Sequence, residues 1–273
     1  MHLTISQRDT AQIWRIERPD RLNALGPTLG QELLDALKHL QDQLARWAAD
    51  PDQGDPPYRT LVIDAAPINS GSDTPIWIAG GDLKELRELK APEEGRSYAW
   101  MLAELCNGLQ DLPIPVLAVI DGLAIGGGVE LALAADLRLA SRRSSFHFKQ
   151  LEVGLATGYG SCQRLIALVG QARATDLLLR CRRLSATEAQ ALGLINDLCE
   201  QAEDLGPALS EILEGLARLS SQGLKVQKKM LHAPFHDERG HLVQQELDDF
   251  ATLWMHPSHK RFLDHFAKPS AVP

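Results

Sequence analysis

Several features that would place a chain in a special class of protein are missing from these 273 residues. No stretch approaches the roughly 18 apolar residues of a membrane span, and the amino terminus has no apolar core of the secretory-signal type. We therefore expect a cytoplasmic protein that does not enter membranes. The four cysteines have neither disulfide-like pairing nor metal-ligand spacing, so we interpret them as reduced thiols and expect no metal.

Positive charge is also scarce. Lys and Arg total 28 against 36 Asp and Glu, which gives a formal net charge of -8. An acidic chain of this kind does not favour general binding of nucleic acid. The glycines do not form a nucleotide-binding fingerprint, because "GGGVEL" departs from G-x-G-x-x-G and no G-K-[ST] is present. With 44% hydrophobic residues, the chain can build one large domain, or one domain with a small appendage.

What the sequence does contain is an alternation of strand and helix patterns. Residues 2–19 alternate apolar and polar positions around a polar turn, which predicts a β-hairpin. Leucines three and four apart predict an amphipathic helix over residues 28–48, and a second helix is expected over residues 92–110. The pattern predicts an α/β core in residues 1–200 and a helical C-terminal region in residues 201–273.

Two segments, "IWIAGGDLKEL" and "VLAVIDGLAIGGGVELALAAD", share one arrangement. In each, an apolar strand passes through glycines into a helix. Glycine weakens a helix and adds no packing, so these turns need another explanation. A helix N-terminus presents free backbone N–H groups at the positive end of the helix dipole. Two such ends that converge would hold a negative oxygen, as an oxyanion hole does; ordinary tight turns are the alternative.

Five ordered segments carry a family resemblance: "IERPDRLNAL", "IAGGDLKEL", "PIPVLAVIDGLAIGGGVELALAADLRLAS", "GSCQRL" and "RRLSATEAQALGLIN". Over residues 3–235 the chain resembles the crotonase superfamily, which contains the enoyl-CoA hydratases and isomerases. The resemblance implies a spiral of ββα units and C-terminal helices that form a homotrimer, often a dimer of trimers. It also implies an acyl-CoA or acyl-carrier-protein thioester as substrate, with no cofactor beyond the coenzyme A moiety of that substrate.

The resemblance implies roles for individual residues. The backbone N–H groups of Gly81 and Gly127 would form the oxyanion hole, and Glu130 would be the principal acid/base. Lys228 stands where the family offers a lysine to the adenosine phosphates of coenzyme A; a solvated helix face is the alternative for it. The segment with Arg21, Leu22 and Ala24 is implied to contact coenzyme A. The turn with Ala79, Gly80, Asp82 and Leu83 is implied to line the thioester channel.

The chain departs from the family pattern where a second catalytic glutamate is usual. Aligning "FHFKQLEVGL" on Phe146 and on Gly154-Leu155 puts Gln150 at that position. Glutamine can hydrogen-bond a water molecule but cannot exchange a proton with it. Glu152 is a candidate substitute, because in an extended strand it would point to the same face as Gln150. His147 is a further candidate.

Three functions remain open on the sequence. Hydration of an enoyl thioester is helped by two carboxylates that hold one water, so a hydratase would use Glu130 with Gln150 to position the water. This hydro-lyase is the expected function. A malonyl-type acyl-CoA decarboxylase or an enoyl-CoA isomerase would need only one acid/base group. A non-catalytic thioester- or RNA-binding paralogue is the third reading, although Gly81, Gly127 and Glu130 are all present.

Overall fold

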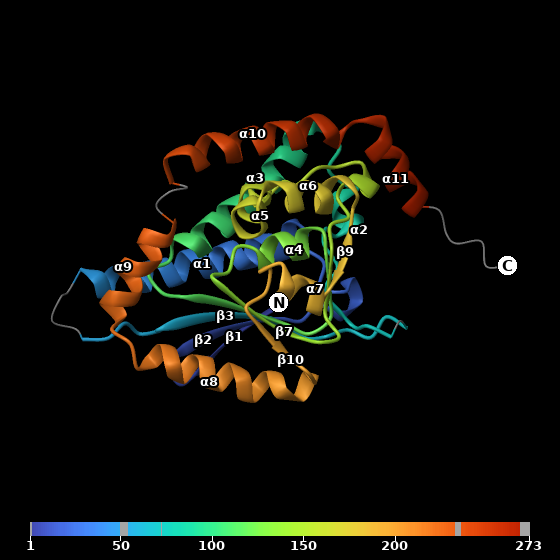
Figure 1. The fold of residues 1–273 in the computed structure, drawn as a ribbon. Helices are drawn as coiled ribbons and strands as arrows, with labels where there is room; N and C mark the ends of the chain where they lie inside the picture. Colours follow the sequence, from blue (N-terminus) through green and yellow to red (C-terminus); the bar gives the residue numbers. More distant parts are fainter. Residues whose placement is uncertain (1, 50–53, 72, 233–235, 268–273) are drawn as a thin grey trace.

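The computed structural model describes residues 2–49, 54–71, 73–232 and 236–267, which form two β-sheets surrounded by helices (Figure 1). A six-stranded sheet has the order β1-β2-β3-β5-β7-β10, and a four-stranded sheet has the order β4-β6-β8-β9. The strands are β1 (Leu3–Arg8), β2 (Ala11–Ile16), β3 (Thr60–Ala65), β4 (Ile76–Ile78), β5 (Val116–Ile120), β6 (Leu123–Ile125), β7 (Leu137–Ser141), β8 (Ser145–His147), β9 (Arg183–Ser185) and β10 (Asp197–Cys199). The helices are α1 (Pro27–Ala48), α2 (Leu83–Leu86), α3 (Pro92–Asp111), α4 (Gly127–Ala132), α5 (Ser161–Val169), α6 (Gln171–Leu179), α7 (Ala186–Ala191), α8 (Leu205–Ala217), α9 (Ser221–His232), α10 (His236–Trp254) and α11 (Pro257–Ala267).

The hairpin and the first long helix follow the predicted patterns. Strands β1 and β2 pair antiparallel from Leu3 opposite Ile16 to Arg8 opposite Ala11, which confirms the predicted hairpin. The leucine stripe of α1 is buried, as its spacing predicts. Helix α3 also confirms the helix expected over residues 92–110. The alternation of strands and helices read from the sequence is therefore the one that the structure contains.

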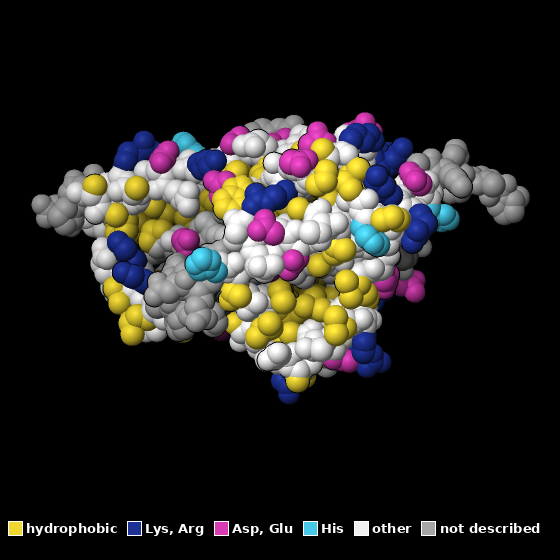
Figure 2. Space-filling model, turned by 90° about the horizontal axis from the view of Figure 1, so that it is seen from above, with side chains coloured by type: hydrophobic (Ala, Val, Ile, Leu, Met, Phe, Trp, Pro, Cys, Tyr) yellow, Lys and Arg dark blue, Asp and Glu magenta, His cyan; other side chains and the backbone are white. Residues whose placement is uncertain are grey.

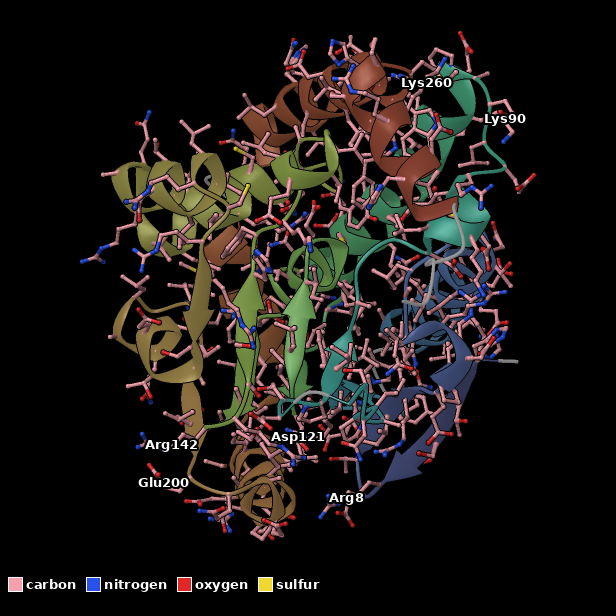
Figure 3. All side chains as sticks on the ribbon, turned by 90° about the vertical axis from the view of Figure 1, so that its right-hand side faces the viewer. Arg8, Lys90, Asp121, Arg142, Glu200 and Lys260 are labelled. Atoms are coloured by element: carbon pink, nitrogen blue, oxygen red, sulfur yellow. The ribbon has the colours of Figure 1, made fainter. Side chains whose placement is uncertain are left out.

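The six-stranded sheet separates two apolar layers. From β2 to β10 its neighbouring strands are parallel. On one face, side chains of β3, β5 and β7 pack against α8 through Leu205, Leu209 and Leu213. Figure 1 shows α8 on the face opposite to α1 and α3. Beyond β7 and β10, Arg142 and Glu200 form an exposed ion pair, which lies at the opposite end of the molecule from Lys90 and Lys260 (Figure 3).

The four-stranded sheet positions the segments that the sequence singles out. Strands β4, β6 and β8 are parallel neighbours, and β9 runs antiparallel to β8. Their carboxyl ends therefore lie side by side, as at the ligand-binding edge of other parallel sheets. Strand β4 leads into Gly80 and Gly81, β6 leads into Gly126 and α4, and β8 leads toward Gln150. Three chain segments far apart in sequence thus meet at one edge.

The C-terminal helices α10 and α11 lie across the top of the molecule in Figure 1. Phe250 and Trp254 of α10 belong to the main hydrophobic core. On the face seen from above, acidic and basic side chains alternate with hydrophobic patches (Figure 2). Such mixed charge on this face does not favour binding to a phosphate backbone. No helix within the described ranges is long and apolar enough to cross a membrane.

A single buried asparagine ties the segment after β2 to the ends of two strands. Asn23 adopts a left-handed backbone conformation with φ of 56°. Its side-chain oxygen accepts a hydrogen bond from the Arg18 N–H at 2.8 Å. Its amide donates to the carbonyls of Ala66 and Trp77, each at 2.8 Å. The turn after β4 pairs with the same segment, because Ala79 N–H donates to the Leu22 carbonyl at 3.1 Å.

Replacing this asparagine should weaken the fold. Asn23→Ala leaves buried carbonyls without a donor, and each such group costs about 1–3 kcal/mol, so we expect the free energy of unfolding to fall by about 2–4 kcal/mol. Urea denaturation would measure the change. The control is Gln31→Ala, which removes an exposed bond to Asp35 and should stay within about 0.5 kcal/mol of the wild type. An equal loss in both variants would contradict the tying role of Asn23.

Candidate active site

The two glycine turns touch each other, which is the first of the two arrangements left open by the sequence. Gly80 has φ of 87°, and a Cβ there would lie 2.9 Å from the Ile125 carbonyl oxygen and 3.5 Å from the Gly127 nitrogen. A Cβ at Gly128 would lie 2.5 Å from the Ile78 carbonyl oxygen. These separations leave no room for a side chain between the strand ends. The glycines are therefore needed for the close approach of the two turns.

Two backbone donors are left over where the turns meet. Among the described residues, no acceptor is found for the N–H of Gly81 or for that of Gly127. Gly127 is the first residue of α4, where an N–H has no partner inside the helix. Neighbouring unpaired donors on adjacent turns can stabilise an oxygen atom that acquires negative charge.

The carboxylate of Glu130 is buried, with 4% of the residue exposed. Its Oε2 accepts hydrogen bonds from the N–H groups of Gly158 and Tyr159, both at 3.1 Å, and from the Ser161 hydroxyl at 2.5 Å. Its Oε1 accepts one from the Gln150 amide at 2.9 Å. Burial raises the pKa of Glu130, while these four donors oppose the rise. A carboxyl group with a raised pKa in such a setting can both accept and return a proton.

Gln150 lies where the sequence places it, and Glu152 does not. Gln150 is buried beside Glu130, and its own side-chain oxygen has no protein partner among the described residues. Residues Leu151–Val153 form a 3-10 turn rather than an extended strand. The Glu152 side chain consequently points outward, is 44% exposed, and pairs with His147 at 3.3 Å and Lys149 at 3.7 Å. The expectation that Glu152 shares the face of Gln150 is wrong, and His147 is engaged in the same exposed pair.

The segment expected to contact coenzyme A lies beside the first glycine turn. Leu25 N–H donates to the Gly80 carbonyl, and Asp82 N–H donates to the Leu25 carbonyl. Leu22 is 36% exposed, whereas Ala24 is buried. The side chain of Arg21 and the residues Ala79 and Leu83 are partly exposed.

The Asp82 side chain does not lie where the prediction of the thioester channel placed it. It is buried, caps α2 by accepting from the Lys84 and Glu85 N–H groups, and lies 3.0 Å from the Arg18 guanidinium. Arg18 also pairs with Glu85. Asp82 therefore holds the turn in place from behind, and the expectation that its side chain lines the thioester channel is wrong.

Lys228 is neither solvated nor available to a phosphate. Only 7% of the residue is exposed. Its ammonium group donates to the carbonyls of Leu109 at 3.1 Å and Ile114 at 2.9 Å, and it lies 2.7 Å from the Asp136 carboxylate. His232 approaches the same carboxylate at 2.9 Å. Both readings of Lys228 made from the sequence are wrong, because this lysine fastens α9 to the core.

Glu246 was not found from the sequence. It lies on α10, and its Oε1 accepts a hydrogen bond from the Ser161 N–H at 3.1 Å. Burial and the negative charge of Glu130 raise the pKa of Glu246 to about 7. Ser161 thus bonds both carboxylates, with its N–H to Glu246 and its hydroxyl to Glu130. The one available signal was a carboxylate within the apolar stripe of α10, where an unpaired charge is costly.

Two tyrosines near the glycine turns were also missed. The hydroxyls of Tyr98 and Tyr159 are 2.6 Å apart, and the Tyr98 hydroxyl donates to the Leu25 carbonyl at 2.9 Å. A Cβ at Gly127 would lie 2.9 Å from the Tyr159 hydroxyl oxygen. In the sequence, the bulky side chain of Tyr159 between two glycines was the available signal. No group of side chains suited to a metal ion is found in the part of the chain that the structure describes.

Comparisons with known sequences point to one family. Residues 53–269 match the family model of enoyl-CoA hydratase/isomerase. The chain is 33% identical over 223 residues to the enoyl-CoA isomerase/hydratase fer4 of Mycosarcoma maydis, covering 78% of this chain and 77% of that protein. It is 36% identical over 203 residues to the human mitochondrial enoyl-CoA hydratase domain-containing protein 2, covering 74% of this chain. It is 34% identical over 187 residues to the rat mitochondrial methylglutaconyl-CoA hydratase, covering 68% of this chain. The matches span 63% of the human protein and 56% of the rat protein, less than two thirds of their lengths.

Solved structures show the same fold. The enoyl-CoA hydratase of Bacillus halodurans superposes with a TM-score of 0.82 at 21% identity, covering 97% of this chain and 100% of that one. An enoyl-CoA hydratase/isomerase of Mycobacterium paratuberculosis gives a TM-score of 0.82 at 22% identity, covering 97% of this chain and 98% of that one. The expected crotonase-type α/β fold is confirmed.

Removing the buried lysine should affect stability rather than thioester binding. Lys228→Met leaves the Asp136 carboxylate with only His232 beside it, and loss of one partner of a buried ion pair typically lowers the free energy of unfolding by about 3–5 kcal/mol. Urea denaturation measures that loss, and calorimetry with butyryl-CoA should give an unchanged Kd. The matched control is Lys229→Met, an exposed lysine on the same helix. Weakened binding in a folded Lys228→Met protein would restore the phosphate-contact reading.

The buried carboxyl of Glu246 should make stability depend on pH. Its pKa is about 7 in the folded state and about 4.3 when unfolded, so the folded state holds the extra proton between these values. Stability contributed by Glu246 is therefore lost as pH rises toward 7. Relative to the wild type, Glu246→Gln should gain about 2–4 kcal/mol between about pH 5 and about pH 8. Thermal or urea unfolding at both pH values measures this gain, and the exposed Asp249→Asn on the same helix should show no such change.

Proposed function

The chain belongs to the enoyl-CoA hydratase/isomerase family, and from this premise we propose that it is a hydro-lyase acting on an enoyl-CoA thioester. The observation that carries the proposal is the buried Glu130 carboxylate, on the helix that begins at one of two unpaired glycine N–H groups. The names of the relatives, which include hydratases, support an activity of this class.

In this proposal the substrate carbonyl oxygen accepts hydrogen bonds from the N–H groups of Gly81 and Gly127. Glu130 removes a proton from a water molecule, whose oxygen bonds to Cβ while the thioester becomes an enolate. The two N–H groups stabilise the enolate oxygen, because fixed donors act strongly where charge develops. Glu130 then returns the proton to Cα. The unpaired side-chain oxygen of Gln150 would accept the second hydrogen of the water and orient it.

A double-bond isomerase is the second candidate. It needs one base that removes a proton at one carbon and returns it at another, and the two glycine donors would stabilise the same kind of enolate. The carboxylate that contacts Gln150 is that of Glu130. One carboxylate is sufficient for isomerisation, and it also permits hydration. The relative fer4 is named as both isomerase and hydratase.

The coenzyme A moiety and the assembly complete the proposal. Coenzyme A would lie along the surface formed by Leu22, Ala79 and Leu83, which are at least partly exposed. We propose no other cofactor. Helix α9 leaves Met230 and Leu231 more than half exposed. An exposed apolar patch of this kind favours contact with another subunit, in keeping with a homotrimer. We further propose that the protein acts in the cytoplasm.

Replacing Glu130 should strongly reduce turnover. Glu130→Gln keeps the shape of the side chain but removes proton exchange, so kcat for crotonyl-CoA hydration should fall by about 10²–10⁴-fold. Loss of the enoyl absorbance, with mass spectrometry of the product, measures the reaction. The matched control is Glu152→Gln, whose outward carboxylate should be dispensable.

Four outcomes test these assignments. Gain of one water on crotonyl-CoA supports the hydro-lyase. Movement of the double bond in a 3-enoyl-CoA without hydration would replace it by the isomerase. Unchanged turnover in Glu130→Gln would remove this carboxylate from the mechanism, and an equal loss in Glu152→Gln would contradict the roles assigned to the two glutamates.

A further inference from the structure

The paired tyrosines stand directly against the reacting groups. Tyr159 donates its backbone N–H to Glu130, and its ring lies against Gly127, where a Cβ would be 2.9 Å from both its Cε2 and its hydroxyl oxygen. The Tyr98 hydroxyl oxygen lies 3.7 Å from the position of a Cβ at Gly81. The pair therefore spans from one glycine turn to the other, beside the carboxylate.

Large aromatic side chains support the pair from behind. The rings of Tyr98 and Tyr159 pack edge to face with centroids 6.1 Å apart. The ring centroid of Trp254 in α10 lies 6.1 Å from that of Tyr98 and 5.5 Å from that of Phe250. Both tyrosines are buried, with about 5% of each exposed at most. An acyl chain that enters between the glycine turns and passes Glu130 would meet the rings of Tyr98 and Tyr159, which we call the aromatic wall. The close packing of the interior resists displacement of these rings.

On another side, Tyr98 lines a pocket of about 390 Å³ between the starts of α1 and α3. Pro27, Leu89 and Met101 also line this pocket. Because the Tyr98 hydroxyl faces Leu25 and the Gly81 turn, its ring separates the glycine turns from that apolar space. The tyrosines thus set the limit of the site on the acyl side.

The wall offers no donor to a negative group. Since the Tyr98 hydroxyl donates to the Leu25 carbonyl, the hydrogen between the two hydroxyls belongs to Tyr159. Both hydroxyl hydrogens are thereby used within the protein. The buried guanidinium of Arg164 donates to the Tyr159 carbonyl and to the side chains of Asn107 and Gln110, and its positive charge already acts on the Glu246 carboxyl. A second carboxylate on the acyl group would meet lone pairs and the Glu130 charge, which disfavours its burial.

From this geometry we infer that the site selects thioesters with short, uncharged acyl groups, and that Tyr98 and Tyr159 are the residues that set this specificity. The inference rests on the proposed function, because it takes the thioester carbonyl to lie at Gly81 and Gly127. It goes further by naming the substrate class and by excluding acyl groups that carry a second carboxylate.

Binding of unreactive saturated thioesters tests the inference apart from turnover. Isothermal titration calorimetry would compare valeryl-CoA, decanoyl-CoA, glutaryl-CoA and free coenzyme A. Valeryl-CoA and glutaryl-CoA differ by one terminal carboxylate, and valeryl-CoA and decanoyl-CoA differ only in length. We expect valeryl-CoA to bind at least about tenfold tighter than decanoyl-CoA or glutaryl-CoA. If an apolar pocket were open to the longer chain, decanoyl-CoA would instead bind more tightly, by roughly tenfold for every two methylenes.

Variants of Tyr159 test the wall itself. Tyr159→Ala should improve decanoyl-CoA relative to valeryl-CoA by about tenfold or more, because methylenes would enter the space of the ring. Tyr159→Phe, which keeps the ring and removes the hydroxyl, should keep the wild-type length preference. If Tyr159→Ala does not fold, Tyr159→Leu replaces it, and the wild-type comparison decides without any variant.

Each result bears on a different statement. Decanoyl-CoA bound by the wild type as tightly as valeryl-CoA would overturn the length limit, and equally tight glutaryl-CoA would overturn the exclusion of charge. Selective binding of valeryl-CoA without hydration of crotonyl-CoA would overturn the proposed hydro-lyase and support the inference. No acyl-CoA bound more tightly than free coenzyme A would overturn the inference, whereas only a lack of crotonyl-CoA hydration would overturn the proposed hydro-lyase.

Discussion

Burying the carboxylate of Glu130 is costly unless hydrogen bonds compensate for lost water. Here three of the four donors come from one loop, because Gly158, Tyr159 and Ser161 all donate to the same oxygen. That loop is held in turn by α10, whose Glu246 accepts from Ser161. The C-terminal helix α10 is therefore part of the site even though it carries no residue of the glycine turns, and the acid/base group depends on a helix more than 100 residues further along the chain.

The parallel order of β4, β6 and β8 explains how so few residues suffice. Each strand ends at the same edge and delivers one element: a free N–H at Gly81, a second N–H with Glu130, and the amide of Gln150. The glycines are needed because a Cβ at Gly80 or Gly128 would collide with the backbone of the neighbouring turn. Backbone proximity, rather than any side chain, brings the two donors together.

The strand-to-helix patterns, which neighbouring residues determine, indicated the two glycine turns, whereas the positions of Glu130 and Gln150 were implied by the family resemblance. The errors came from conformation and from distant partners. Glu152 was misplaced because Gly154, in a left-handed conformation, ends a 3-10 turn where an extended strand was assumed. The surroundings of Lys228 depend on Asp136, which no local pattern connects to it. Tertiary contacts of this kind leave little trace in a single sequence.

Charge gives the site its remaining character. Two buried carboxyl groups, Glu130 and Glu246, share Ser161, and burial raises the pKa of each. The cation on this side, Arg164, donates to neutral groups of the protein, and its charge opposes the rise in the pKa of Glu246. A developing enolate is tolerable in such a place because its charge is brief and two fixed N–H groups face it. A permanent negative charge on the acyl group has no such partner, so the same arrangement that supports one kind of anion excludes the other.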